Sequence, residues 1–120
     1  MLPKKNADDV GLETLLDLDG EIYAIDEWYW VKFEARKVDA TEHIPHGIRY
    51  SLTLHDKNNR RILGYDNAHG VKKPKRKKFS GKRIFWDHKH EHEKISSYEF
   101  ENAYNLLRDF WDDVNKLISG

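Results

Sequence analysis

The sequence predicts an α+β protein in which an antiparallel sheet of four to five strands carries a C-terminal amphipathic helix on one face. Apolar and polar residues alternate over residues 29–36 and again over residues 48–55, a period of two that is typical of half-buried strands. Between residues 100 and 118 the apolar residues instead recur every three or four positions, which indicates a helix with one apolar face. The apolar side of the sheet is the only large surface that this helix can cover.

Length and composition are consistent with a single domain spanning residues 1–120. Hydrophobic residues make up 38% of the chain, and four Trp, six Tyr and five Phe add large buried areas to one core. The chain has no cysteine, which excludes disulfides and thiolate metal sites. The N-terminal residues are polar and no apolar run reaches membrane length, so a cytoplasmic protein without membrane contact is expected.

The first half of the chain reads as strands and tight turns. Residues 1–20 are expected to be a flexible start with at most one turn of helix. Two strands follow at residues 21–25 and 28–38, and then a loop at residues 39–46. The hairpin after this loop turns at residues 57–59, where the asparagines tolerate a positive φ.

The second half begins with a basic segment. Residues 70–81 combine lysines with Pro74 and two glycines, and are expected to form a mobile basic loop. Residues 82–86 are predicted to form a last strand that returns residues 87–92 to the sheet. The helix is predicted to begin at Ser96, because Ser96 and Glu99 have the spacing of a capping box.

The distribution of charge indicates an anionic partner. Acidic residues dominate both ends of the chain and basic residues the middle. The densest run repels itself unless an anion is near, and phosphate backbones are the common anion; it comprises Lys72, Lys73, Lys75, Arg76, Lys77 and Lys78. Lys32, Arg36 and Arg49 are expected on the sheet face away from the helix. These residues predict RNA binding, although an ordinary solvated face would also be basic.

The histidines suggest a reactive centre. His69 follows a predicted strand end, a position at which a rigid scaffold often holds functional groups. If residues 87–92 are extended, His88 and His90 point the same way, with His92 next in the row. We predict that His69, His88, His90 and Arg49 are the catalytic residues, with histidines as acid and base and arginine on the phosphate. Charged surface histidines are the alternative.

This predicted chemistry needs neither a metal nor another cofactor. A weaker alternative is a Zn²⁺ site formed by His88, His90 and His92, with Asp87 as an oxygen ligand. His69 and Asp66 are further possible ligands, and Asp66 can equally orient His69. Asp66 and Asn67 can also satisfy backbone groups locally at the strand end.

Several segments of the chain resemble the TumE-type toxins of type II toxin–antitoxin modules. The resemblance covers most of residues 20–92, and its segments are residues 21–23, 30–35, 45–56, 64–69 and 87–90. The longest run is Pro45-His46-Gly47-Ile48-Arg49-Tyr50-Ser51-Leu52-Thr53-Leu54-His55-Asp56. A second run is Gly64-Tyr65-Asp66-Asn67-Ala68-His69, and the last is Asp87-His88-Lys89-His90.

The resemblance implies a toxin that inhibits translation by cleaving RNA and is neutralised by a helix-turn-helix antitoxin. It assigns no catalytic residue, although Arg49, His69, His88 and His90 lie inside the resembling segments. A module that binds RNA or protein without catalysis remains an alternative, as does a histidine- and metal-dependent nuclease. In a further alternative, the basic run at residues 72–78 docks the antitoxin.

Overall fold

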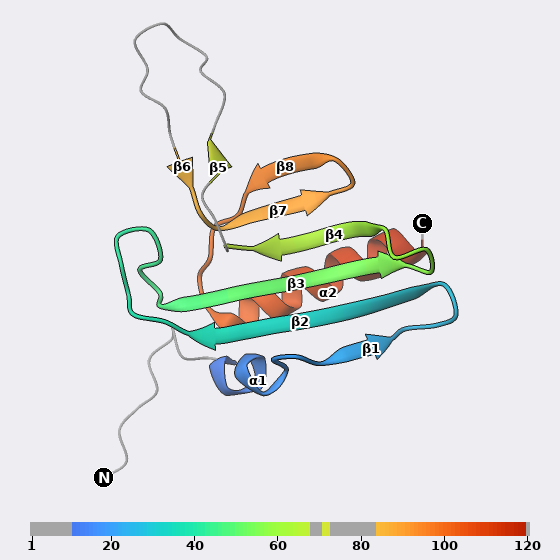
Figure 1. Ribbon diagram of the computed structural model, residues 1–120, viewed down its shortest axis with the longest axis horizontal. Coiled ribbons are helices and arrows are strands. Elements are labelled where there is room, and N and C mark those ends of the chain that lie inside the picture. The colour runs from blue at the N-terminus through green and yellow to red at the C-terminus, as the bar shows by residue number, and fades with distance from the viewer. Residues whose placement is uncertain (1–10, 68–70, 73–83, 120) are drawn as a thin grey trace, which may run out of the picture.

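In the computed structural model, which describes residues 11–67, 71–72 and 84–119, an open antiparallel sheet lies in front of one long helix (Figure 1). This arrangement confirms the predicted α+β class and the C-terminal helix on one face of the sheet. The sheet is larger than expected, because six strands form it where four to five were predicted. No helix in the described ranges is long and apolar enough to cross a membrane.

The strands of the sheet follow the chain except for one small insertion. In spatial order they are β1 (Ile22–Ala24), β2 (Tyr29–Lys37), β3 (Ile48–Asp56), β4 (Arg61–Asp66), β7 (His88–Glu91) and β8 (Lys94–Ser97). Every neighbouring pair is antiparallel. Between β4 and β7 the chain leaves the sheet, and β5 (Val71–Lys72) pairs there with β6 (Ile84–Phe85) as a separate ribbon (Figure 1).

The core lies between the sheet and its two helices, α1 (Leu12–Asp17) and α2 (Ala103–Ser119). In the register of β2 and β3, Phe33 lies opposite Leu52, and both side chains are buried. The ring of Phe110 from α2 packs edge-on against Phe33, with the ring centroids 5.7 Å apart. The alternation read from the sequence therefore places the apolar face of these strands correctly, as the period of two requires.

The predicted turn between β3 and β4 is present. Asn59 has a φ of 65°, the left-handed conformation that asparagine tolerates. The carboxylate of Asp56 accepts hydrogen bonds from the backbone N–H groups of Asn58 and Arg60 at 2.9 and 3.0 Å.

The predicted start of the helix is wrong. Ser96 and Ser97 belong to β8, where they lie opposite Lys89 and His88. The helix begins at Ala103, and the Asn102 side chain caps it by accepting a hydrogen bond from the N–H of Asn105 at 2.7 Å. Ser96 and Glu99 have the spacing of a capping box, but Ser96 pairs with β7 in the sheet and therefore does not begin the helix.

The structure changes two further expectations, one for residues 82–91 and one for residues 12–17. β7, not residues 82–86, joins the sheet beside β4, while Ile84 and Phe85 pair with β5. In residues 1–20, where a flexible start with one turn of helix was expected, residues 12–17 form α1, and Leu15 is fully buried in the core. Residues 1–10 and 73–81 lie outside the described part of the chain.

Candidate functional site on the open sheet face

We call the side of the sheet away from α2 the open face. Strand alternation places Lys32, Glu34 and Arg36 of β2 on it, together with Arg49, Ser51 and Thr53 of β3. On the next strands Asp66 lies opposite Ser51, and His88 lies opposite Asp66. One row of the open face therefore runs Glu34, Ser51, Asp66, His88 across four strands.

Asp66, His88 and His90 form a compact group, which we call the His–Asp cluster. His88 Nε2 lies 2.9 Å from Asp66 Oδ1, and His90 Nε2 lies 3.5 Å from Asp66 Oδ2. The side chains of His88, Asp66 and His90 are 0%, 8% and 12% exposed, respectively. The prediction that His88 and His90 point the same way is confirmed, because both reach the same carboxylate.

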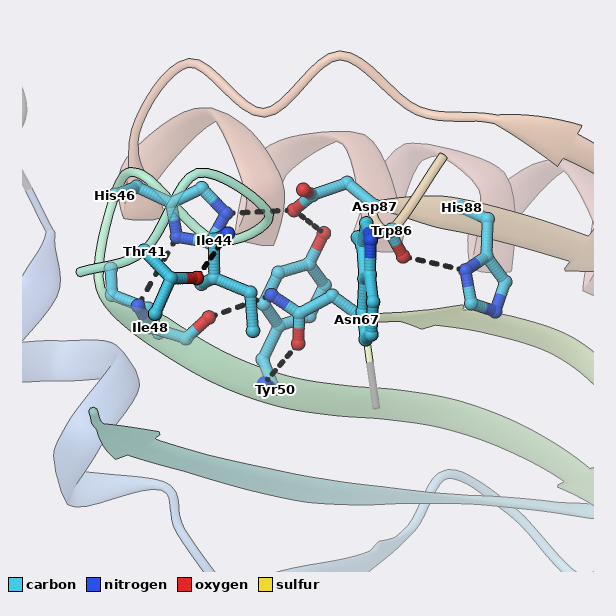
Figure 2. A network of polar contacts seen from close by, with 9 residues as sticks. All are labelled: Thr41, Ile44, His46, Ile48, Tyr50, Asn67, Trp86, Asp87 and His88. Atoms are coloured by element: carbon cyan, nitrogen blue, oxygen red, sulfur yellow. Dashed lines mark hydrogen bonds and ion pairs between the residues drawn. The ribbon is translucent and has the colours of Figure 1, made fainter. Parts of the chain in front are cut away.

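Both ring nitrogens of His88 face oxygen atoms. Nδ1 lies 2.7 Å from the carbonyl oxygen of Trp86 (Figure 2). Nε2 lies 2.9 Å from Asp66 Oδ1. Burial lowers the pKa of His88, but the Asp66 carboxylate and the Trp86 carbonyl favour the charged ring and hold the pKa above its usual value. The two oxygen atoms hold the ring of His88 in place beside Asp66. His90 is more exposed and is therefore better placed to exchange protons.

A cleft on the open face lies over β2 and β3, and one of its lining residues, Ser51, lies opposite Asp66 of the cluster. It encloses ≈ 670 Å³, and its polar lining includes Lys32, Glu34, Arg36, Arg49 and Ser51. Arg36 and Arg49 lie directly opposite each other on β2 and β3. Arg49 is two residues from Ser51, so it is a diagonal neighbour of Asp66.

Among the described residues, the two arginines of this cleft have no acidic partner. No carboxylate in the described ranges forms an ion pair with either one, and the buried Nε of Arg49 has no hydrogen-bond partner there. Lys32, by contrast, pairs with Glu34 at 3.0 Å. Like charges directly opposite in a sheet repel each other, so the Arg36–Arg49 pair favours an anion in the cleft.

Asp87 is next to His88 in sequence but points to the other side of the sheet. Its Oδ2 accepts hydrogen bonds from the hydroxyl of Tyr50 at 2.7 Å and from Nε2 of His46 at 2.8 Å (Figure 2). The N–H of Ile48 donates to His46 Nδ1 at 3.2 Å, which leaves the proton of that ring on Nε2. Asp87 therefore fastens the loop of residues 39–46 to the sheet and does not join His88 and His90.

The remaining histidines are spread over the molecule. His46 packs against Phe100 with ring centroids 3.9 Å apart. His92 lies in the turn between β7 and β8 with a φ of 55° and is exposed, so it does not continue the row of His88 and His90. His69 lies outside the described residues, as do Lys73, Lys75, Arg76, Lys77 and Lys78. Lys72 belongs to β5.

The sequence did not identify two features of this site. It left Asp66 open as a metal ligand, as an orienter of His69 or as a local backbone partner, and only the register of β4 and β7 sets it opposite His88. Arg61 was not considered, yet its side chain passes over Gly64, between Thr53 and His90. A Cβ built on Gly64 would lie 3.4 Å from Arg61 Cδ. Gly64 is the sequence signal that could have indicated the position of Arg61, because a glycine leaves a place on the open face without a side chain of its own.

Comparison with known proteins identifies a family. A family model described as toxin TumE matches residues 5–118, nearly the whole chain. No curated protein and no solved structure matches the chain.

Proposed function

The chain belongs to the TumE family of toxins and is the toxin of a toxin–antitoxin system, and we propose that it acts by cleaving RNA on the open face. One observation carries the proposal. Two arginines that form no ion pair with a described carboxylate occupy positions adjacent to the His–Asp cluster on the same sheet face. Binding of a phosphate and activation of a hydroxyl are the two requirements of RNA cleavage, and this face offers a group for each.

The arginine pair supports phosphate binding. Arg36 and Arg49 present guanidinium groups to one cleft, and a bound phosphate would relieve their mutual repulsion. Arg49, the nearer to Asp66, would hold the scissile phosphate and stabilise the charge that develops on it. Lys32 and the basic run of residues 72–78 would follow the backbone on either side, which positions the RNA without reading its sequence.

The His–Asp cluster supports the chemical step. In a metal-free reaction His90 would take the proton of the attacking 2′-hydroxyl, and Asp66 would orient its ring. A second group would return a proton to the leaving 5′-oxygen, and His69 is the predicted donor. The same nitrogens and carboxylate are also a set of metal ligands, so the test of cleavage includes a chelator.

The antitoxin of this system is proposed to be a helix-turn-helix protein, as the resemblance to the family implies. The basic run of residues 72–78 is a second proposed contact for it. Replacing the lysines and arginine of that run by serine and measuring co-purification with the antitoxin tests this contact. If the antitoxin still co-purified with this variant, the run would not be a contact for the antitoxin, and RNA binding would be its remaining proposed role.

The experiment that tests the proposed function measures cleavage of a defined RNA by the purified toxin. The parent is expected to cleave with or without EDTA if His90 acts as a base, and only without EDTA if the cluster holds a metal. His90→Ala is expected to lower the rate by about 10²–10⁴-fold, the usual contribution of a general acid or base. His92→Asn is the matched control, because asparagine tolerates the positive φ of that turn.

Two outcomes would overturn the assignment. If the folded parent binds RNA but leaves it intact under all conditions, the open face is a binding surface and the toxin is not a nuclease. If cleavage occurs and His90→Ala cleaves as fast as His92→Asn, the reactive centre lies elsewhere.

A further inference from the structure

We propose that the His–Asp cluster binds one divalent transition-metal ion through Asp66, His88 and His90. Each residue offers one ligand atom, and these atoms all lie within 4.8 Å of one another. Among the described residues, these three are the His and acidic side chains that lie close enough together to share one ion. The inference rests on the proposed function and deepens it at the same site, where His90 would hold a metal ion in place of acting as the base of a metal-free reaction.

The distances between the donors suit one ion. Metal–ligand bonds of ~2.0–2.2 Å, at angles between octahedral and tetrahedral, separate neighbouring ligand atoms by roughly 2.8–3.6 Å. The distance from His88 Nε2 to Asp66 Oδ1 is 2.9 Å, and that from His90 Nε2 to Asp66 Oδ2 is 3.5 Å. The ligand atoms of the whole group lie within 4.8 Å of one another, so an ion would draw the most distant pair together by rotation of the side chains.

The surroundings of His88 match those of a metal-bound histidine. Its Nδ1 faces the Trp86 carbonyl at 2.7 Å, so the N–H can donate there while the lone pair of Nε2 points to the ion. Such a hydrogen bond on the second nitrogen fixes the tautomer and orientation of metal-ligating histidines. A bound ion would take the place of the Nε2 proton beside Asp66.

The backbone holds the three ligands in a rigid frame. His88 and His90 alternate on one strand, and Asp66 lies opposite His88 on the neighbouring strand. Gly64, opposite His90, places no side chain of its own beside the ligands. Ligands on paired strands keep their separation, which limits the ordering that binding requires.

The ligand set selects the class of metal. Two imidazoles and one carboxylate suit Zn²⁺, Mn²⁺, Fe²⁺ or Co²⁺ better than Mg²⁺ or Ca²⁺, which prefer oxygen ligands. Three protein ligands leave coordination positions open, and His90 lies on the more exposed side of the group. An RNA phosphate held by Arg49 could supply an oxygen at such a position.

The alternative is that the cluster is only an ion pair between Asp66 and two histidines. A buried pair of that kind holds its proton and has no affinity for a metal beyond that of surface histidines. The two possibilities differ in stoichiometry and in the dependence of binding on His90.

The test titrates the untagged, full-length toxin with Zn²⁺ by calorimetry, after chelator treatment and dialysis, and repeats the titration with Co²⁺ while recording visible absorption. One equivalent of Zn²⁺ should bind and raise the melting temperature, and Co²⁺ should produce an absorption band. His90→Ala should weaken binding at least ~10-fold and remove the band, since second-shell losses alone cost ~10–100-fold. His92→Asn should bind like the parent.

The proposal is overturned if the parent binds no metal, or if His90→Ala binds as tightly as His92→Asn. Circular dichroism of each variant shows whether it remains folded, and His90, the most exposed ligand, is the substitution that the fold tolerates best. RNA is absent from these measurements. A metal-binding protein that does not cleave RNA would therefore refute the proposed function alone, and cleavage without metal binding would refute this inference alone.

Discussion

The two faces of the sheet differ in the partners of some of their described charged groups. On the helix side, Tyr98 donates a hydrogen bond to Asp109 at 2.7 Å, and Lys89 pairs with Asp113 at 2.6 Å. On the open face, Arg36 and Arg49 oppose each other without a carboxylate from the described residues. Matched partners are what stability requires, whereas facing like charges cost stability. This difference is one reason why we propose that the function lies on the open face.

The largest expected loss of stability comes from a substitution in the core on the helix side of the sheet. Phe110 is fully buried against Phe33, so Phe110→Ala should lower the free energy of unfolding by about 3–5 kcal/mol. Urea denaturation followed by circular dichroism measures it. Asp112→Ala, an exposed change on the same helix, should stay within about 0.5 kcal/mol of the parent. A Phe110→Ala variant as stable as this control would mean that α2 does not close the core.

Alkaline pH should also weaken the helix side. Burial, with the adjacent carboxylates, raises the pKa of Tyr50, Tyr65 and Tyr98 above the ordinary value. These groups deprotonate more easily in the unfolded chain, so their stabilisation is complete below a pH of about 10 and is lost as the pH rises beyond it. Stability measured between pH 8 and pH 11 should therefore fall.

Tyr98→Phe should make this fall with pH shallower, because phenylalanine has no proton to lose. Tyr104→Phe is the control, since Tyr104 is exposed on α2. Equal slopes for Tyr98→Phe and the control would show that the Tyr98–Asp109 contact does not matter in solution.

The smallest expected change in stability is on the open face, and it tests the comparison of the two faces most sharply. Arg36→Ala removes the repulsion with Arg49 and should raise the free energy of unfolding by about 0.2–1 kcal/mol. The same variant should bind RNA more weakly, as measured by filter binding at fixed salt. Lys37→Ala removes the same charge from the neighbouring position of β2, without a facing arginine. If Lys37→Ala gained as much stability, the repulsion would not be specific to the pair.

Local patterns were enough to predict the central hairpin. The alternation through residues 29–36 and 48–55 depends only on the period of a strand, and Asn59 carries its own conformational preference. The same logic failed at Ser96, where a good capping sequence lies in β8. Its partner, Lys89, lies across a turn in which His92 adopts a positive φ, and histidine is a weak signal for such a turn.

The candidate site was only partly predictable for a similar reason. That His88 and His90 share a side follows from strand alternation. The same alternation sets Asp87 on the other side, so the alternative that made Asp87 a ligand beside them was wrong. The choice of Asp66 as their partner depends on the register between β4 and β7, which are separated by the inserted ribbon. No local pattern encodes that register.

The most direct measurement of the central claim, that the open face carries the toxic activity, is growth arrest on induced expression without the antitoxin. His90→Ala on the open face should relieve the arrest while the protein stays folded and expressed at the parent level. Tyr98→Phe on the helix side should arrest growth like the parent. A folded His90→Ala variant as toxic as the parent would contradict the claim.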